Sequence, residues 1–260
     1  MSDRMYNDHP IAVFDSGIGG ISVLRELVRI MPNEDYIYYG DSHNAPYGMK
    51  TLDEVRALTT AHEQEMFREG AKGLVVACNT ATSAAVRSLR ERYPAIPIVG
   101  IEPALKPAAL SGEHPRVLVM ATPMTIREEK FHRLMERYVD RAEIIPLPCP
   151  GLMDFVERGD LHGTDLRKYL EELLYAYRGG RIDAAVLGCT HYPFARDLIQ
   201  EILGASVAIY DGGEGTAREM RRRMEEAGML TSRQTEGCVE FRNSEATEEK
   251  LALCRRLLYI

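Results

Sequence analysis

The sequence reads Gly73-Leu-Val-Val-Ala-Cys78-Asn-Thr80 at one point and Ala184-Ala-Val-Leu-Gly-Cys189-Thr190-His191 at another. Each stretch is an apolar run that ends in a small residue, a cysteine and polar residues. Short apolar runs of this kind are typical of buried strands in parallel sheets. A helical pattern follows each stretch, so the sequence predicts the same strand–cysteine–helix unit twice.

The alternation of strands and helices extends outward over most of the chain. It predicts parallel sheets with helices on both faces, because parallel strands need crossover helices. Strands are predicted at 11–14, 35–39, 74–77, 116–120, 143–147, 184–187 and 207–211. Helices are predicted after the first strand and at 51–69, 79–92, 125–138, 166–177 and 193–203, and residues 239–260 are predicted to form a last strand and helix.

The pattern begins again after the proline-rich stretch Pro94–Pro115. We therefore expect an α/β protein with two similar doubly wound parallel-sheet lobes and the active site in the cleft between them. Residues 1–100 plus 208–260 are predicted to form the first lobe and residues 101–207 the second, so that the strand at 207–211 and the helix after it return to the first lobe. Ligands of such sheets bind at the carboxyl ends of the strands.

The composition is that of an ordinary globular protein. A formal net charge of −7 at pH 7 argues against a general nucleic-acid binder, which usually carries a basic surface. A small anionic substrate is compatible with it, since a local site can oppose the net charge. The N-terminal stretch MSDRMYNDHP has no apolar core typical of a secretory signal, and no segment approaches the ~18 apolar residues of a membrane span. We therefore expect a cytoplasmic protein without a membrane or nucleic-acid partner.

The cysteines indicate free thiols in a reducing compartment. They are odd in number, lie far apart and form no CxxC pair, which argues against a disulfide framework and against a zinc site. The five positions are Cys78, Cys149, Cys189, Cys238 and Cys254.

Cys78 and Cys189 are each predicted to lie between the end of a strand and the start of a helix. Free N–H groups and the helix dipole stabilise an anion there, and the reactive form of a cysteine is its thiolate. Either residue alone could instead be a small buried hydrophobe. Two thiols in matched contexts could form a redox disulfide, or act as acid and base on opposite faces of one carbon. The second arrangement produces racemisation or epimerisation.

Other polar residues are predicted near the same sheet edges. Asp15 could orient a thiol or an ammonium group and Ser16 could bond substrate, although both could instead cap the next helix. His191 could assist Cys189 as an acid. Asn79, Thr80 and Thr190 offer donors for a carboxylate at helix N-termini, a role compatible with N-capping. Glu157 could equally be a solvated helix charge, and the loop with Tyr47 and Gly48 could be an ordinary turn.

The sequence contains no dinucleotide-binding fingerprint and no P-loop, and no lysine context indicates a pyridoxal Schiff base. The expected enzyme therefore uses no cofactor and no metal.

Several motifs together resemble bacterial glutamate racemases, within the cofactor-independent aspartate/glutamate racemase family. They occur in the family's order and spacing over nearly the whole chain. The motifs are DSGIGG from Asp15, GDSHNAPYG from Gly40, ACNTA from Ala77, GIEPALKPA from Gly100, LGCTHYPF from Leu187 and DGGEGTA from Asp211.

The resemblance implies interconversion of L- and D-glutamate without pyridoxal phosphate or metal, the supply of D-glutamate for peptidoglycan, and a homodimer. The matched acid/base residues are Cys78 and Cys189. The family's auxiliary acids fall on Asp15, Glu157 and His191, and its substrate contacts on Asp15, Ser16, Tyr47, Gly48, Asn79, Thr80, Thr190 and His191, with Thr122 and Thr125 as neighbours. Ala121 is a departure from the family's pattern, which commonly has glycine before this pair of threonines.

Three other functions fit the same residues. An aspartate racemase or another two-thiol epimerase shares the chemistry but takes a different substrate. A two-lobed binding protein would close on an amino acid without exchanging its α-proton. A thiol redox protein would form a Cys78–Cys189 disulfide under mild oxidant.

Overall fold

The computed structural model describes residues 7–260, and the chain divides into two compact units. The first unit comprises the residues up to Ile101 and Gly213–Ile260, and the second comprises Glu102–Gly212. Each unit contains one parallel sheet, as the alternating pattern predicts. The prediction about a secretory signal rests partly on residues 1–6, which lie outside the described residues. No helix in the described range combines the length and apolar character that a bilayer crossing requires.

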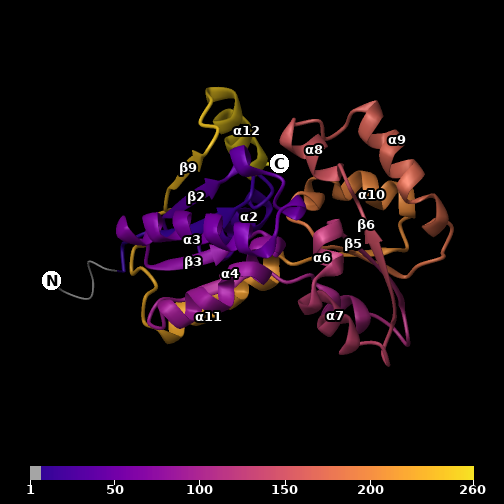
Figure 1. Ribbon diagram of the computed structural model, residues 1–260, viewed down its shortest axis with the longest axis horizontal. Coiled ribbons are helices and arrows are strands. Elements are labelled where there is room, and N and C mark those ends of the chain that lie inside the picture. The colour runs from indigo at the N-terminus through magenta and orange to yellow at the C-terminus, as the bar shows by residue number, and fades with distance from the viewer. Residues whose placement is uncertain (1–6) are drawn as a thin grey trace. The chain divides into compact units, whose positions relative to one another are not determined.

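The first sheet has the strand order β4-β3-β1-β2-β9. Helix α3 packs on α4, whereas α2 packs on α11 and α12, so the helices form two groups around the sheet (Figure 1). The elements are β1 (Ile11–Asp15), α2 (Ile21–Ile30), β2 (Tyr36–Gly40), η1 (Ser42–Asn44), η2 (Tyr47–Met49), α3 (Leu52–Arg68), β3 (Gly73–Val76), α4 (Asn79–Arg92), β4 (Ile98–Gly100), α11 (Gly213–Glu226), β9 (Val239–Asn243) and α12 (Glu248–Leu258).

The second sheet has the strand order β6-β5-β7-β8. Its central strands β5 and β7 are buried along nearly their whole length, so their apolar runs form the core of this unit. The elements are α5 (Leu105–Ala109), β5 (Arg116–Ala121), α6 (Pro123–Arg127), α7 (Glu129–Glu136), β6 (Glu143–Pro148), α8 (Leu152–Glu157), α9 (Thr164–Leu173), η3 (Tyr175–Tyr177), β7 (Ala184–Leu187), η4 (Tyr192–Ala195), α10 (Arg196–Leu203) and β8 (Ala208–Asp211).

The two sheets share one topology. Numbered within its own unit, the order fourth, third, first, second is common to both sheets, because β8-β7-β5-β6 corresponds to β4-β3-β1-β2, and the first sheet adds β9 beside β2. The strand that precedes each matched cysteine, β3 or β7, therefore pairs with the first strand of its sheet. In each sheet the second and third strands lie on opposite sides of the first strand, so the strand order reverses there. Ligands of doubly wound sheets bind at such a point.

Two predictions about the second half of the chain are wrong. The strand at 207–211 does not return to the first lobe, because β8 pairs with β7 in register Ala184↔Ala208. Only a short connection, Gly204 to Val207, separates it from α10, and a short right-handed crossover places successive strands side by side. The single helix predicted at 125–138 is two helices, because the backbone of Glu128 is extended (φ −68°, ψ 133°) between α6 and α7.

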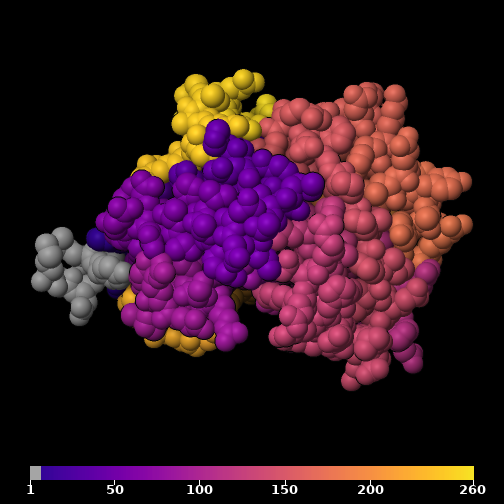
Figure 2. Space-filling model, in the orientation of Figure 1, coloured from indigo at the N-terminus to yellow at the C-terminus, as the bar shows by residue number. Residues whose placement is uncertain are grey.

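The C-terminal part of the chain completes the first sheet. Strand β9 pairs in parallel with β2, and α12 packs on α2. Figure 2 shows this yellow segment lying against the indigo N-terminal part of the same unit. The last strand and helix predicted from residues 239–260 are both present.

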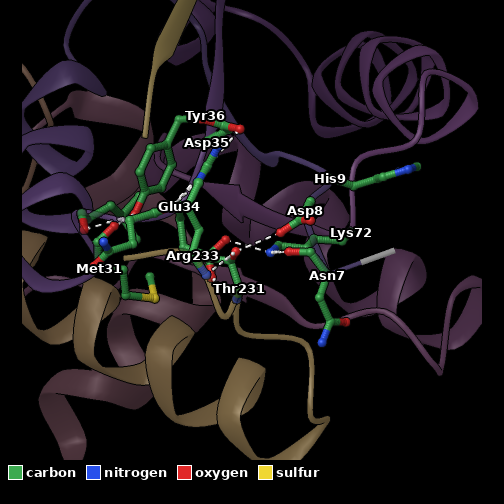
Figure 3. A network of polar contacts seen from close by, with 12 residues as sticks. Asn7, Asp8, His9, Met31, Glu34, Asp35, Tyr36, Lys72, Thr231 and Arg233 are labelled. Carbon is green, nitrogen blue, oxygen red and sulfur yellow. Dashed lines mark hydrogen bonds and ion pairs between the residues drawn. The ribbon is translucent and has the colours of Figure 1, made fainter. Parts of the chain in front are cut away.

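A network of polar contacts closes the amino-terminal edge of the first sheet (Figure 3). The Lys72 ammonium lies 2.5 Å from a Glu34 carboxylate oxygen, and both side chains are buried. Lys72 also donates to the carbonyl of Asn7. The backbone N–H of Thr231 donates to Glu34 at 2.8 Å, so this network also holds the segment between α11 and β9.

Glu63 is another buried ionisable residue, on the face of α3 that lies against the core. Its side chain is fully buried, and neither carboxyl oxygen has a hydrogen-bond partner among residues 7–260. Burial disfavours the carboxylate and raises the pKa of Glu63 to about 9. The folded protein therefore holds a proton that the unfolded chain releases above a pH of about 4.5.

We expect Glu63→Gln to remove a pH dependence of stability. Because the folded pKa is raised, the stabilisation is complete below the unfolded pKa and is lost as pH rises toward 9. The free energy of unfolding of the parent protein, relative to the variant, should fall by up to about 1.4 kcal/mol per pH unit between pH 5 and 9. Denaturant unfolding of both proteins across this range measures the difference, and parallel curves would show that Glu63 is not protonated in the fold.

Candidate functional site

The candidate residues of each unit gather at the carboxyl ends of its strands. In the first unit Asp15 ends β1 and Cys78 follows β3, which pairs with β1. In the second unit Thr122 follows β5 and Cys189 follows β7, which pairs with β5. The matched strand order thus puts one thiol at an equivalent position in each sheet.

Asp15 is fully buried and shapes the turn that begins α2. Its Oδ2 accepts a hydrogen bond of 2.8 Å from the backbone N–H of Gly20. A Cβ atom on Gly20 would lie 2.6 Å from the Asp15 Cβ and 2.9 Å from the Ala77 Cβ, so only glycine fits there. Asp15 does not cap the helix, because the N-cap of α2 is Gly20, which makes no side-chain capping bond. The bond to Gly20 instead fixes the Asp15 carboxylate in the turn before α2, next to the strand that leads to Cys78.

Cys78 is the N-cap residue of α4 and is 7% exposed. Its sulfur accepts a hydrogen bond from the backbone N–H of Ala81 at 3.5 Å and one from the hydroxyl of Ser16 at 3.4 Å. Both donors favour the thiolate form, because each places positive charge density against the sulfur. Ser16 thus contacts the thiol directly, in addition to any contact with a ligand.

The predicted donors after Cys78 are buried as well. Asn79 and Thr80 form the first turn of α4 and are 8% and 3% exposed. The Asn79 Oδ1 atom accepts no hydrogen bond from the described residues. A buried acceptor of this kind is costly unless a ligand or water pairs with it, and an ammonium group has the required chemistry.

Tyr47 lies in the apolar cluster that contains Cys78, with its side chain 1% exposed. Its hydroxyl donates to Asp41 at 2.7 Å. The phenol oxygen is therefore already engaged, and a substrate contact in this loop would come from the ring or from the main chain of Tyr47 and Gly48.

Cys189 belongs to a chain of three polar side chains in the second unit. The Cys189 sulfur lies 3.6 Å from Nδ1 of His191, and Nε2 of His191 lies 2.8 Å from a carboxylate oxygen of Glu157. Glu157 is the last residue of α8, so the fold brings it to a site that sequence spacing alone did not select. A carboxylate on one ring nitrogen orients the imidazole and sets its second N–H toward the sulfur.

Electrostatic contacts keep a proton on His191. Burial by itself would lower the pKa of His191, because it disfavours the imidazolium. The hydrogen bonds and negative charges of Cys189 and Glu157 outweigh burial and raise the pKa well above its usual value of about 6.5. His191 is therefore an acid at neutral pH, in contact with the thiol.

The threonines of the second unit are close to these groups in the fold. Thr190 is buried directly after Cys189. Thr122 caps α6, its hydroxyl accepting from the Thr125 N–H at 3.1 Å, and the two hydroxyl oxygens are 2.9 Å apart. Ala121, the departure from the family pattern, is fully buried at the end of β5. The capping geometry around Thr122 therefore forms with alanine at this position.

Two residues at this edge of the first sheet were not predicted from the sequence. Asp41 directly follows β2 and is fully buried, and His62 of α3 lies 3.4 Å from its carboxylate. The position of Asp41 at a strand end was an available signal. No spacing in the sequence connects it with His62, which lies within a helix.

Within residues 7–260, no three side chains of histidine, cysteine, aspartate or glutamate come together as a set that could hold a metal ion.

Comparisons with known proteins agree on one family. The Asp/Glu/Hydantoin racemase family matches residues 11–235. A glutamate racemase of Clostridium perfringens is 51% identical over 260 residues, which is 100% of both chains. The crystal structure of a Francisella tularensis glutamate racemase in complex with D-glutamate has a TM-score of 0.83 at 26% identity, covering 98% of this chain and 95% of that one. A Thermus thermophilus glutamate racemase in complex with β-chloro-D-alanine has a TM-score of 0.80 at 34% identity, covering 96% and 93%.

Proposed function

Because this chain belongs to the Asp/Glu/Hydantoin racemase family and is an isomerase of the glutamate racemase type, we propose that it interconverts L- and D-glutamate by two-base proton transfer. Cys78 and Cys189 are the two bases. The observation that carries the proposal is their equivalent placement, because each follows the strand that pairs with the first strand of its sheet. Each sulfur also has a polar side chain within hydrogen-bond distance, Ser16 for Cys78 and His191 for Cys189.

The proposed reaction moves one proton off the α-carbon and one onto it. One thiolate takes the α-proton, and the C–H electron pair moves into the adjacent carboxylate. The opposite thiol then gives its proton to the other face of the carbon and becomes the thiolate. The reverse reaction begins from that second form, so the resting enzyme exists in two protonation states.

The auxiliary groups have separate roles in this proposal. Asp15 fixes the turn beside Cys78 and Ser16 donates to its sulfur, which stabilises the thiolate. His191 donates from Nδ1 to Cys189, and Glu157 holds the imidazolium in place. Asn79, Thr80 and Thr190 are the proposed donors and acceptors for the carboxylates and ammonium group of glutamate, with the main chain of Tyr47 and Gly48.

The α-proton of an amino acid is a weak acid, so the intermediate carbanion needs strong stabilisation. N–H and O–H donors that are already in position provide it best where water is excluded. The buried side chains of Asn79, Thr80 and Thr190 are consistent with such a site.

Three wider roles follow from family membership and belong to the same proposal. The D-glutamate produced supplies peptidoglycan synthesis, the enzyme works in the cytoplasm, and it forms a homodimer. Light scattering of the purified protein tests the last role, since a monomer at micromolar concentration would contradict it.

A racemisation assay on purified protein without added cofactor tests the proposed activity. Each enantiomer of glutamate and of aspartate is incubated separately and the products are separated by chiral chromatography. Conversion of both glutamate enantiomers is expected. Conversion of aspartate alone would identify an aspartate racemase, and binding of glutamate without conversion would identify a binding protein.

We expect Glu157→Gln to slow turnover and change its pH dependence. The variant keeps an acceptor oxygen but replaces the carboxylate beside the imidazolium by a neutral amide, and the weaker bond corresponds to about a 10- to 100-fold lower kcat. Because Glu157 raises the pKa of His191, its loss lets His191 deprotonate at lower pH, and the basic limb of the pH profile should move to lower pH. Asp154→Asn, an exposed acid of the same helix, is the control. An unchanged pH profile in Glu157→Gln would contradict this role.

A further inference from the structure

Asp41 is a buried carboxylate at the candidate site to which the proposed reaction gives no role. It is the first residue after β2, and its side chain is fully buried. Burial alone would raise its pKa. Hydrogen bonds from His62, Tyr47, Ser244 and Asn44 nevertheless hold the pKa of Asp41 well below its usual range. The fold therefore maintains a buried negative charge at this point, at a considerable desolvation cost.

The donors to Asp41 come from three parts of the first unit, one of which is Ser244, directly after β9. The Tyr47 hydroxyl lies at 2.7 Å, and the Asn44 amide lies 3.0 Å from each carboxylate oxygen, both in the loop after β2. Nε2 of His62 reaches the carboxylate from α3 at 3.4 Å. The imidazole packs on the ring of Tyr39, with 4.5 Å between centroids, and lies 5.8 Å from that of Phe14. His62 is thus held toward Asp41 by its aromatic neighbours.

Tyr47 connects this network to Cys78. Its ring lies in the same buried cluster as Cys78, and its centroid is 6.3 Å from that of Phe14. Burial, the bond to Asp41 and the charge on Cys78 all raise the pKa of Tyr47. The phenol is therefore a neutral donor to Asp41 at neutral pH, and its pKa depends on the charge of the Cys78 thiol.

We propose that Asp41 and His62 are positioning residues of the Cys78 half of the site. They fix the phenol of Tyr47, and with it the loop of residues 42–50, against the Cys78 thiol. Neither residue touches the reacting atoms. The inference rests on the proposed function where it concerns turnover, since Tyr47 and Gly48 are proposed substrate contacts. The placement of Tyr47 in the buried cluster of Cys78 is independent of the reaction.

Two measurements on Asp41→Asn test the proposal. The first is the rate at which iodoacetamide alkylates Cys78 relative to Cys189 in the same molecule, followed by peptide mass spectrometry. The second is the kcat and KM for each glutamate enantiomer. We expect Cys78 to be labelled several-fold faster relative to Cys189. We expect KM to rise about tenfold for both enantiomers, because the amide of asparagine is a weaker acceptor than the carboxylate for Tyr47 and His62.

His62 provides matched variants that keep the proposal testable if Asp41→Asn does not fold. His62→Gln retains an N–H donor and should keep the parent ratio of Cys78 to Cys189 labelling. His62→Leu removes the donor and should change this ratio as Asp41→Asn does, with thermal unfolding confirming that both variants are folded.

The outcomes separate this proposal from the proposed function. An unchanged labelling ratio in folded Asp41→Asn or His62→Leu overturns the positioning role even if the parent protein is an active racemase. A raised ratio in a protein that does not racemise glutamate supports the positioning role and overturns the proposed function instead.

Discussion

Serine in place of Cys78 or of Cys189 is expected to lower racemisation in both directions by roughly 10²- to 10⁴-fold, the usual contribution of one positioned acid or base. Each direction of the reaction needs both residues, one as thiolate and one as thiol. A serine hydroxyl is a far weaker acid than a thiol, so neither role can be filled by the substitute. Circular dichroism of L- and of D-glutamate solutions follows the two directions separately.

Cys238→Ser is the control for these variants. Cys238 is exposed next to the start of β9, where its N–H donates to Asp35, and it is remote in the fold from the carboxyl ends of the strands. Its replacement should leave both rates unchanged. Full activity of either Cys78→Ser or Cys189→Ser would contradict the assignment of two thiol bases.

Lys72→Met is expected to destabilise the protein by about 3–5 kcal/mol, the typical cost of removing one partner of a buried ion pair. Glu34 is 3% exposed and Lys72 is fully buried. Burial lowers the pKa of Lys72 although the charge of Glu34 opposes this shift, so the ammonium depends on its partner. The variant leaves a carboxylate in the interior without its counter-charge. Denaturant unfolding measures the loss.

The double variant Lys72→Met with Glu34→Gln separates the pair from other effects. It removes both charges, and we expect it to be more stable than Lys72→Met alone, because replacing both members of a buried pair costs less than exposing one of them. Arg87→Ala breaks the Arg87–Glu91 ion pair, in which both side chains are exposed. This variant should change stability little. Equal losses in Lys72→Met and Arg87→Ala would contradict the proposed importance of the buried pair.

The sequence predicted those strands and helices that depend on the properties of neighbouring residues in the chain. The strand before Cys78 and the helix 79–92 were predicted from contiguous residues, and both are present. The sequence did not predict that β8 pairs with β7, because the residues of β8 are partly exposed and have no pattern that distinguishes one neighbouring strand from another. The break between α6 and α7 at Glu128 could not be predicted from the sequence either, because the residues on both sides favour a helix.

The candidate site shows the same division. Cysteines at strand ends could be found because their immediate context repeats. Glu157 was placed only by family resemblance, and the fold brings it to His191 from another helix. Asp41 was missed although its position at a strand end was a signal, because charged residues are ordinarily exposed. His62 was missed because nothing in the sequence of a helix shows that one of its side chains reaches a carboxylate after another strand. The contacts that keep such groups in place are tertiary.

The origin of the new α-proton provides the most direct test of the two-thiol mechanism. L-glutamate is incubated with the enzyme in D₂O, and both enantiomers are recovered at low conversion and analysed for deuterium at the α-carbon. If separate thiols remove and return the proton, the D-glutamate formed carries deuterium while the remaining L-glutamate keeps its original hydrogen. Deuterium entering recovered L-glutamate as fast as D-glutamate appears would indicate one base serving both faces, and would contradict the mechanism.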